Sequence, residues 1–307
     1  MRTRHACPRV YTPPLRELTP DTSLGFEVCD FAEALGFVVL PWERWLLIHA
    51  LEIMGDFGCE WALRFRTVLV LVARQNGKTL VSTILTLYML YILQVSLIIG
   101  TAQELDQAEE AWDACVDAIN ADDELKEELV SAKYGNAGRR LKLTGGRRYI
   151  TKASNRKAGR GKSADFILLD ELREHRDWEA WGALTKTGMA RDNSLVWCMS
   201  NAGDGSSVVL RHLRLQAHAA LGDPDGIVAA IGGVADKPDD DDARDSALGW
   251  FEWSAPHDAD PADPETWAWA NPSMGWLIQE RKLRAAQATD PADVFKTECL
   301  CQWVEAV

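Results

Sequence analysis

The sequence predicts an α/β protein in which helices cover both faces of a mostly parallel β-sheet. Three observations support this prediction. Apolar strand patterns alternate with helical patterns along the chain, a buried-type strand at Thr67–Ala73 runs into a glycine-containing turn and a helix, and the segment Asp165–Glu171 ends in two carboxylates. Strands that are separated by helices usually pair in parallel, and both faces of such a sheet are buried. The 307 residues suffice for one large or two modest domains.

The first part of the chain contains an arm, a helical region and the first strands. Residues 1–25 hold four of the twelve prolines, which suggests an extended N-terminal arm. The segment Phe26–Ile53 has an apolar stripe typical of helices, with a break at Pro41. The elements predicted next are a strand at 67–72, a helix at about Lys78–Leu93, a strand at Val95–Gly100 and an acidic amphipathic helix that ends near Ile119.

The second part continues the alternation after a hairpin. A short helix is expected at Asp122–Ser131, and Gly145-Gly146 can turn a hairpin between Leu141–Leu143 and Arg147–Thr151. The remaining predicted elements are a strand at 166–169, a helix around Trp178–Leu184, a strand at Ser194–Ser200, a helix at about Ser207–Leu221, and a short strand with two or three helices in Trp250–Val307. We therefore divide the chain into an arm (1–25), a core (26–221), an acidic loop (222–249) and a small helical subdomain (250–307).

The turn after the first strand has the layout of a phosphate-binding loop. It ends in Gly77-Lys78-Thr79 at a helix start. Backbone N–H groups there can hold phosphates, the lysine can reach the β- and γ-phosphates, and the threonine hydroxyl can ligate Mg²⁺. Val72 stands where the usual pattern has its first glycine, and Arg74 lies inside the loop. Taken alone, this turn leaves nucleotide binding and an ordinary strand–helix connection both open.

A second strand delivers Asp170 and Glu171 about ninety residues later. In phosphoryl transfer, Asp170 would hold Mg²⁺ directly or through water, and Glu171 would polarise the attacking water. An exposed helix start is the alternative, because acidic residues favour the first turn of a helix. The order of the two motifs favours a P-loop NTPase of the ASCE type. The strand at 95–100 falls between them, which fits the branch with an added strand and a catalytic glutamate.

The strand at 194–200 ends in Ser200-Asn201-Ala202-Gly203. A polar residue on a strand beside the catalytic carboxylate can sense the γ-phosphate and transmit that state to the rest of the molecule. A simple turn after a buried strand explains the same residues, and the sequence does not decide between the two.

Charge is distributed unevenly along the chain. The net charge is −13, yet residues 133–162 contain eleven basic residues and no acidic residue, so the rest carries a balance of −24. Such a block suits the phosphates of a nucleotide, a nucleic acid or both, and a solvated basic face is the alternative. Within it, Arg147, Arg148 and Lys152 are predicted DNA contacts. The acidic run Asp236–Asp245 favours a solvated loop over a metal site, because like charges repel and no spaced ligands occur.

Cysteine usage and hydropathy indicate the cellular compartment. The seven cysteines are odd in number and show no paired metal spacing, which favours a reducing compartment without a disulfide framework. The longest apolar stretch, Leu80–Ile99, is interrupted by polar residues, so we expect helix, turn and strand rather than a membrane span.

Five segments resemble the large terminase subunit of tailed double-stranded-DNA bacteriophages, in the branch similar to that of phage HK97. They are ARQNGKT (Ala73–Thr79), RGKSADFILLDE (Arg160–Glu171), SNAG (Ser200–Gly203), PETWAWANPSMG (Pro264–Gly275) and FKTECLCQWV (Phe295–Val304). The resemblance extends from about Pro41 to the end of the chain. It implies an ATPase motor domain that uses ATP and Mg²⁺ to move double-stranded DNA into an empty procapsid in the host-cell cytoplasm. The implied partners are the portal protein, the small terminase subunit and further copies of the chain in a ring.

The resemblance also assigns roles to individual residues. Glu171 and Arg74 would be catalytic, and the residues implied to bind the nucleotide are Arg74, Gln75, Asn76, Gly77, Lys78 and Thr79. Thr79 and Asp170 would hold the metal, and Ser200, Asn201 and Ala202 would couple hydrolysis to motion. Arg160, eleven residues before Glu171, would be a finger arginine that reaches the ATP of a neighbouring subunit, a contribution of roughly 10³–10⁵ in rate.

Two departures from the family pattern affect what is expected. Trp42 and Glu43 lie in the stretch that the resemblance places near adenine, but Glu43 stands where the family commonly has Gln. Terminase large subunits normally continue into an RNase H-like nuclease, and this chain stops about where the linker to it would begin. We therefore expect an isolated ATPase domain without nuclease activity.

Two other functional classes are weighed against this interpretation. A two-lobed helicase of the same P-loop branch would need a second α/β lobe, which the roughly one hundred residues after Gly203 cannot supply. A non-hydrolysing assembly or DNA-binding subunit would have a degenerate nucleotide site, and the presence of both Lys78 and Glu171 argues against it.

Overall fold

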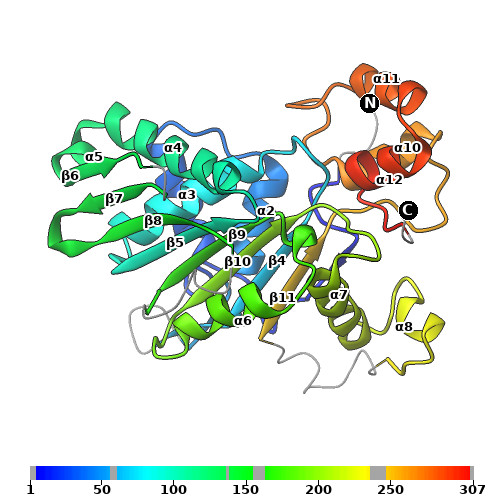
Figure 1. Cartoon of the computed structure of the whole chain (residues 1–307), viewed down its shortest axis with the longest axis horizontal. Helices are drawn as coiled ribbons and strands as arrows, with labels where there is room; N and C mark the ends of the chain where they lie inside the picture. The colour runs from blue at the N-terminus through cyan, green and yellow to red at the C-terminus, as the bar shows by residue number, and fades with distance from the viewer. Residues whose placement is uncertain (1–4, 56–60, 136–137, 155–162, 236–246, 305–307) are drawn as a thin grey trace.

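A nine-stranded sheet dominates the computed structural model, which describes residues 5–55, 61–135, 138–154, 163–235 and 247–304 (Figure 1). The strand order is β1-β11-β4-β10-β9-β5-β8-β7-β6, and β2 and β3 form a separate pair. The strands are β1 (Val10–Tyr11), β2 (Ile53–Met54), β3 (Ala62–Leu63), β4 (Thr67–Leu71), β5 (Leu97–Ala102), β6 (Leu129–Lys133), β7 (Arg140–Leu143), β8 (Arg148–Ala153), β9 (Phe166–Asp170), β10 (Leu195–Ser200) and β11 (Leu248–Glu252).

Helices lie on both sides of this sheet in Figure 1. The described helices are α1 (Gly25–Ala34), α2 (Pro41–Ala50), α3 (Lys78–Tyr91), α4 (Leu105–Ala121), α5 (Asp123–Glu127), α6 (Glu179–Thr185), α7 (Val208–Ala220), α8 (Ile227–Ala230), α10 (Pro264–Ala270), α11 (Glu280–Thr289) and α12 (Ala292–Leu300). Among the described residues, no helix is both long enough and apolar enough to cross a membrane.

Six neighbouring strands, β11, β4, β10, β9, β5 and β8, run parallel, and antiparallel strands extend both edges. Alternate residues of the β4 segment enter two different cores. Val68 and Val70 pack with α1 to α4, whereas Leu69 and Leu71 pack with α6 and α7. The period of two explains why this strand is apolar at every position. The predicted fold class, a mostly parallel sheet with helices on both faces, is confirmed.

Strand β10 lies between β4 and β9. The strand at 95–100 was expected to be the added strand between the strands of the two nucleotide motifs. This strand, β5, instead lies on the far side of β9. Chain order does not give spatial order, because a crossover connection can skip a neighbour. The consequence is that the segment Ser200–Ala202, which begins with the last residue of β10, leaves the sheet between the two nucleotide motifs.

The region after α4 also differs from expectation. The helix expected at Asp122–Ser131 ends at Glu127, and residues from Leu129 form β6 against β7. Asp122 caps the short α5, since its side chain accepts a hydrogen bond from the backbone N–H of Leu125. The predicted hairpin forms as β7 and β8, and β6 completes an antiparallel extension of the parallel sheet.

Strand β11, which was expected at the start of the C-terminal part, belongs to the main sheet. It pairs with β4 on one side and with β1 of the N-terminal arm on the other. Helices α10, α11 and α12, here called the C-terminal subdomain, have a separate apolar core that includes Trp267, Leu283 and Phe295. The domain boundaries given above stay a prediction.

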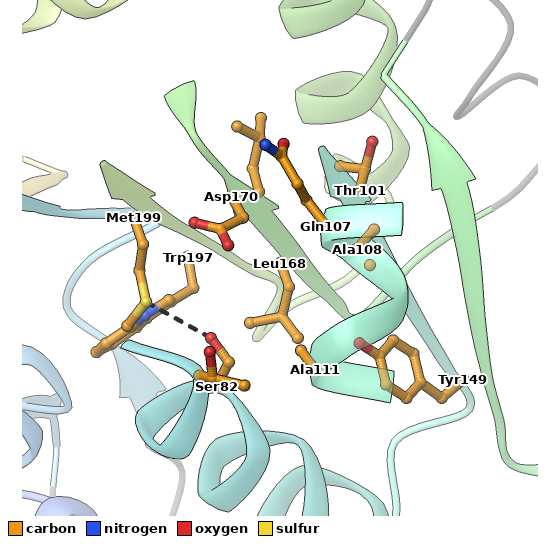
Figure 2. Close-up of a pocket in the computed structure, with 13 residues that line it drawn as sticks. Ser82, Thr101, Gln107, Ala108, Ala111, Tyr149, Leu168, Asp170, Trp197 and Met199 are labelled. Carbon is orange, nitrogen blue, oxygen red and sulfur yellow. Dashed lines mark hydrogen bonds between the residues drawn. The ribbon is translucent and has the colours of Figure 1, made fainter. Parts of the chain in front are cut away.

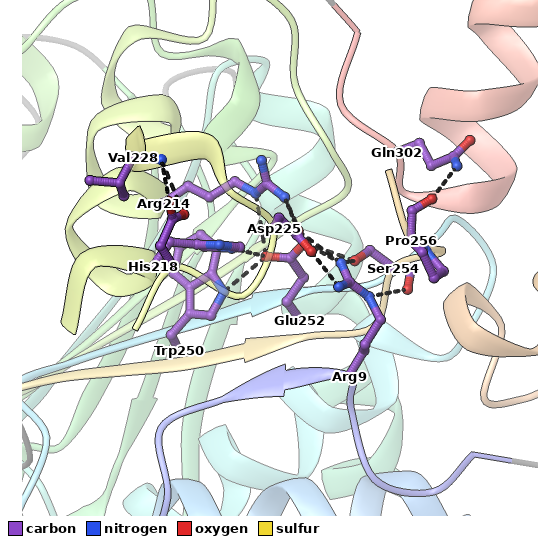
Figure 3. A network of polar contacts seen from close by, with 11 residues as sticks. Arg9, Arg214, His218, Asp225, Val228, Trp250, Glu252, Ser254, Pro256 and Gln302 are labelled. Carbon is purple, nitrogen blue, oxygen red and sulfur yellow. Dashed lines mark hydrogen bonds and ion pairs between the residues drawn. The ribbon is translucent and has the colours of Figure 1, made fainter. Parts of the chain in front are cut away.

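A buried polar network fastens β11 to the arm and to α7 (Figure 3). Glu252 is 1% exposed and faces Arg214 of α7 at 3.1 Å and His218 at 3.2 Å. Asp225 bridges Arg214 at 2.9 Å and Arg9 of the arm at 2.5 Å. Carboxylates and a histidine gathered in this way resemble a metal site. Both carboxylates already face guanidinium groups, whose charge opposes a cation, so we interpret the network as a structural tie.

Candidate nucleotide-binding site

The loop between β4 and α3 begins the site. It spans residues 72–77, and α3 starts at Lys78. Gly77 has φ +106°, in the left-handed region that favours glycine. A Cβ at this position would also lie 2.6 Å from Oε1 of Glu43. The backbone conformation therefore favours glycine, and a Cβ at this position would also force the Glu43 carboxyl group to move.

Lys78 and Glu171 lie side by side at the end of the sheet. Lys78 Nζ is 3.4 Å from Glu171 Oε1, and the other carboxylate oxygen is 3.2 Å from Nε of Arg173. Glu171 follows β9 directly and has φ +51°, an uncommon conformation for a residue with a side chain. Such strain is concentrated at functional sites, where the surrounding structure enforces it. Here the conformation directs the carboxylate back toward the loop.

Asp170 and Thr79 line one pocket between α3, α4, β9 and β10 (Figure 2). The Asp170 carboxylate accepts a hydrogen bond from the backbone N–H of Glu171 at 2.9 Å. Burial raises the pKa of Asp170 above its ordinary value, and the charge of Lys78 opposes this shift. A carboxylate and a hydroxyl at one pocket are the hard oxygen ligands that Mg²⁺ prefers, so the two residues fit such an ion.

Asn76 points inward from the loop. Its side-chain amide donates to Asn271 Oδ1 at 3.1 Å, and its Oδ1 accepts from the backbone N–H of Ser273 at 3.0 Å. Ser273 Oγ donates to the Asn76 carbonyl at 2.6 Å and accepts from Trp42 Nε1 at 2.8 Å. Asn76 and Trp42 are 0% and 1% exposed. Both were predicted to bind the nucleotide, which stays a prediction; in the structure the two side chains are buried on the inner side of the loop and hold its shape.

Glu298 of α12 is a site residue that sequence reasoning missed. Its carboxylate lies 2.5 Å from Arg74 Nε and 2.7 Å from Arg173 Nη1, and it accepts a hydrogen bond from Asn201 Nδ2 at 2.9 Å. Arg173 and Asn201 are 125 and 97 positions away in the chain. No local pattern can indicate such a convergence. The sequence signal was limited to the segment Phe295–Val304, which resembles the terminase family but in which no residue was assigned a role.

The segment after β10 takes part in the same cluster. Ser200 and Asn201 are 0% exposed and Ala202 is 1% exposed. Ser200 Oγ accepts a hydrogen bond from the backbone N–H of Arg173 at 3.1 Å. The segment therefore contacts both the residues after β9 and, through Asn201, the carboxylate of Glu298. Any displacement of Arg74 or Arg173 must alter their ion pairs with Glu298.

The remaining predicted residues lie elsewhere. Arg160 is outside the described residues. Arg147 is 7% exposed, forms an ion pair with Glu128 and donates to the Leu90 carbonyl at 2.7 Å. Its guanidinium holds the antiparallel extension against α3 and is not part of an exposed basic surface. Gln75 and Arg148 are exposed, and Lys152 is half-buried.

A basic groove lies on the antiparallel extension. The basic side chains that line it are Lys133, Arg140, Lys142, Arg148 and Arg191. Leu97 and Arg148, the first residues of β5 and β8, also line it. The groove therefore lies at the strand beginnings, whereas the phosphate loop and Glu171 follow strand ends. Of the three residues predicted to contact DNA, only Arg148 lines this groove.

Comparison with known proteins supports the fold assignment. No protein-family model matches the sequence, and no curated protein matches it. Among solved structures, the chain is similar to the HK97 bacteriophage large terminase, with a TM-score of 0.70, 19% identity, and coverage of 92% of this chain and 55% of that chain. It is also similar to the ATPase domain of the Thermus phage P74-26 large terminase, with a TM-score of 0.59, 14% identity, and coverage of 90% and 98%. At these identities the likeness shows the fold, which is that of terminase ATPase domains.

Replacement of Glu298 by alanine tests the convergence on this carboxylate. Arg74, Arg173 and Asn201 would lose their shared acceptor, so we expect the free energy of unfolding to fall by about 1 to 3 kcal/mol in denaturant titrations. Thr297→Ala on the same helix is the matched control, because among the described residues the Thr297 hydroxyl bonds back to the Asp293 carbonyl of its own helix. If both variants lose the same free energy of unfolding, the contacts of Glu298 with Arg74, Arg173 and Asn201 do not stabilise the protein.

Proposed function

We propose that this chain is the ATPase motor domain of a phage large terminase, which hydrolyses ATP to translocate double-stranded DNA into a procapsid. One observation carries the proposal: Lys78 and Glu171 meet at 3.4 Å at the end of a sheet that has the terminase ATPase fold. A lysine of a phosphate loop beside a glutamate that follows a buried strand is the arrangement that phosphoryl transfer needs. The chain spans 55% of the length of the HK97 protein, so the portal protein and the small terminase subunit are proposed partners on resemblance alone.

The residues of the site divide the chemistry between them. The backbone N–H groups at the start of α3 and the Lys78 ammonium would hold the β- and γ-phosphates. Thr79 and Asp170 would hold Mg²⁺, which when bound neutralises charge on the phosphate oxygens. Glu171 would orient and polarise the attacking water. In this structure its carboxylate faces Lys78 and Arg173. Phosphates that attract Lys78 would therefore release Glu171 to act on the water.

Hydrolysis and binding can be separated with two variants. Glu171→Gln keeps the shape of the side chain but removes the base, so steady-state ATP turnover should fall at least about 100-fold with little change in the Kd for ATP. Lys78→Ala should weaken ATP binding itself, because it removes the cation that faces the phosphates. A Glu171→Gln variant that still turns over ATP would contradict the assignment of the base.

We also propose that the active form is a ring in which Arg160 completes the site of the adjacent subunit. The proposal rests on the position of Arg160 eleven residues before Glu171 in the sequence. A guanidinium from a second chain would stabilise charge that develops on the γ-phosphate.

This proposal predicts rescue in mixtures. ATP turnover should rise faster than linearly with protein concentration, and Arg160→Ala should abolish it without weakening ATP binding. Mixing Arg160→Ala with Glu171→Gln should restore part of the activity, because some interfaces then combine an intact base with an intact arginine. Turnover that is linear in concentration and indifferent to Arg160 would identify a self-contained ATPase.

For DNA, we propose that the basic groove on the antiparallel extension contacts the phosphate backbone. Five basic side chains line it, and no acidic side chain is among its described lining residues. Contacts with phosphates release counterions, which makes binding weaken with salt. Lys152 lies further along β8, beyond the residues that line the groove, and would contribute less.

The double variant Lys142→Ala, Arg148→Ala tests the groove. Two lost phosphate contacts should weaken DNA binding and reduce the slope of log K against log salt by about 1.8. The control is Arg281→Ala, Lys282→Ala, which removes the same charge from exposed positions of α11. An equal loss in the control would point to overall charge instead of a groove. Arg147 is unsuitable for this test, because its replacement would disturb folding.

A further inference from the structure

Glu43 is a buried acid directly behind the phosphate loop. It lies in the first turn of α2 and is 0% exposed. One carboxyl oxygen, Oε2, accepts a hydrogen bond from the backbone N–H of Leu40 at 2.8 Å and so caps the helix. The other oxygen, Oε1, has no hydrogen-bond partner among the described residues. It is this oxygen that lies 2.6 Å from the ideal Cβ position of Gly77.

Among the residues that the structure describes, no charged side chain is paired with Glu43. Arg44, the next residue of α2, forms an ion pair with Glu33 of α1. Lys78 follows Gly77 in the loop, but its ammonium faces Glu171 at 3.4 Å. Leu277 of the C-terminal subdomain packs against the same point at Gly77. On α1, the nearby titratable group is the buried thiol of Cys29.

An unpaired carboxylate at this position would be costly for two reasons. A buried ion without a partner loses its hydration. In addition, the phosphates that the loop is built to hold would lie across a single layer of backbone from Oε1, so like charges would face each other. A neutral carboxylic acid avoids both costs and keeps the capping bond to Leu40. Burial raises the pKa of Glu43 to about 7, although the hydrogen bond from the Leu40 N–H acts in the opposite direction.

We propose that Glu43 is a positioning residue of the phosphate loop that is protonated whenever nucleotide is bound, so that binding takes up a proton at this side chain. The inference rests on the proposed nucleotide site. It makes the affinity for ATP and ADP sensitive to pH in the physiological range.

The direction of the effect follows from linkage. Below pH 7 Glu43 is mostly neutral in the free protein, so nucleotide binding requires no further protonation of this side chain. As the pH rises above 7, the free protein must first gain a proton at Glu43, and the affinity falls. If only the neutral form binds, the affinity decreases about tenfold between pH 6 and pH 8.

Calorimetric titration of Mg·ADP into the wild-type chain and Glu43→Gln tests the proposal. Glutamine keeps the size of the side chain and the acceptor for Leu40 but cannot ionise. Relative to this variant, the wild type should lose about tenfold in affinity from pH 6 to pH 8. Titrations in buffers of different ionisation enthalpy should show about 0.8 of a proton taken up near pH 7.5 by the wild type. The variant should show only the titration of the nucleotide.

Two further variants keep the outcomes distinct. Glu127→Gln makes the same chemical change at an exposed acid on α5 and should retain the wild-type pH profile. Lys78→Ala should lose binding at every pH. Coincident pH profiles for wild type and Glu43→Gln, with binding still dependent on Lys78, would overturn the role of Glu43 and leave the nucleotide site intact. A wild type that binds no Mg·ADP at all would overturn both. Should Glu43→Gln not fold, the absence of proton uptake by the wild type would still refute the proposal.

Discussion

The buried amide of Asn76 is the interaction on which the geometry of the site depends. Its hydrogen bonds join the phosphate loop to Asn271 and Ser273, and Ser273 in turn holds Trp42 of α2. Hydrophobic packing alone does not hold a loop of mostly polar residues in one conformation. Buried hydrogen bonds hold it instead, because another conformation would leave their donors and acceptors without partners. They also explain why α2 and the C-terminal subdomain meet at the same end of the sheet.

Around this fixed loop, charges of opposite sign alternate. Lys78 faces Glu171, Glu171 faces Arg173, and Arg173 shares Glu298 with Arg74. Each cation is satisfied by the protein itself. A polyanionic ligand would compete for these cations and thereby redistribute the pairs, including those that reach the segment after β10. This gives a physical route from the phosphate loop to the C-terminal subdomain through exchange of partners rather than through bending of the sheet.

The sequence predicted what depends on local pattern. Apolar strands and the positions of Lys78, Asp170 and Glu171 at strand ends follow from periodicity and chain order. It did not predict that Asn76 faces inward, because a loop has no period that assigns a face. Arg147 and Arg148 are adjacent, and only the fold decides that the first is buried and the second is exposed. Glu298 depends on the convergence of distant segments, and the identity of the strand between β4 and β9 depends on crossover connections. Both require the three-dimensional arrangement.

The long-range ties of the phosphate loop also affect how the protein matures. Asn76 and Lys78 leave the ribosome early, whereas Asn271, Ser273 and Glu298 follow far later in synthesis. At a typical elongation rate of roughly 5–20 residues per second, the loop waits on the order of tens of seconds for the partners that define its shape. During this interval the nascent chain contains the phosphate-loop sequence, but the loop does not yet have the hydrogen bonds that fix its conformation. Competence to bind nucleotide would thus be acquired only after the segment that contains Glu298 has been synthesised, so a shorter nascent chain could not consume ATP.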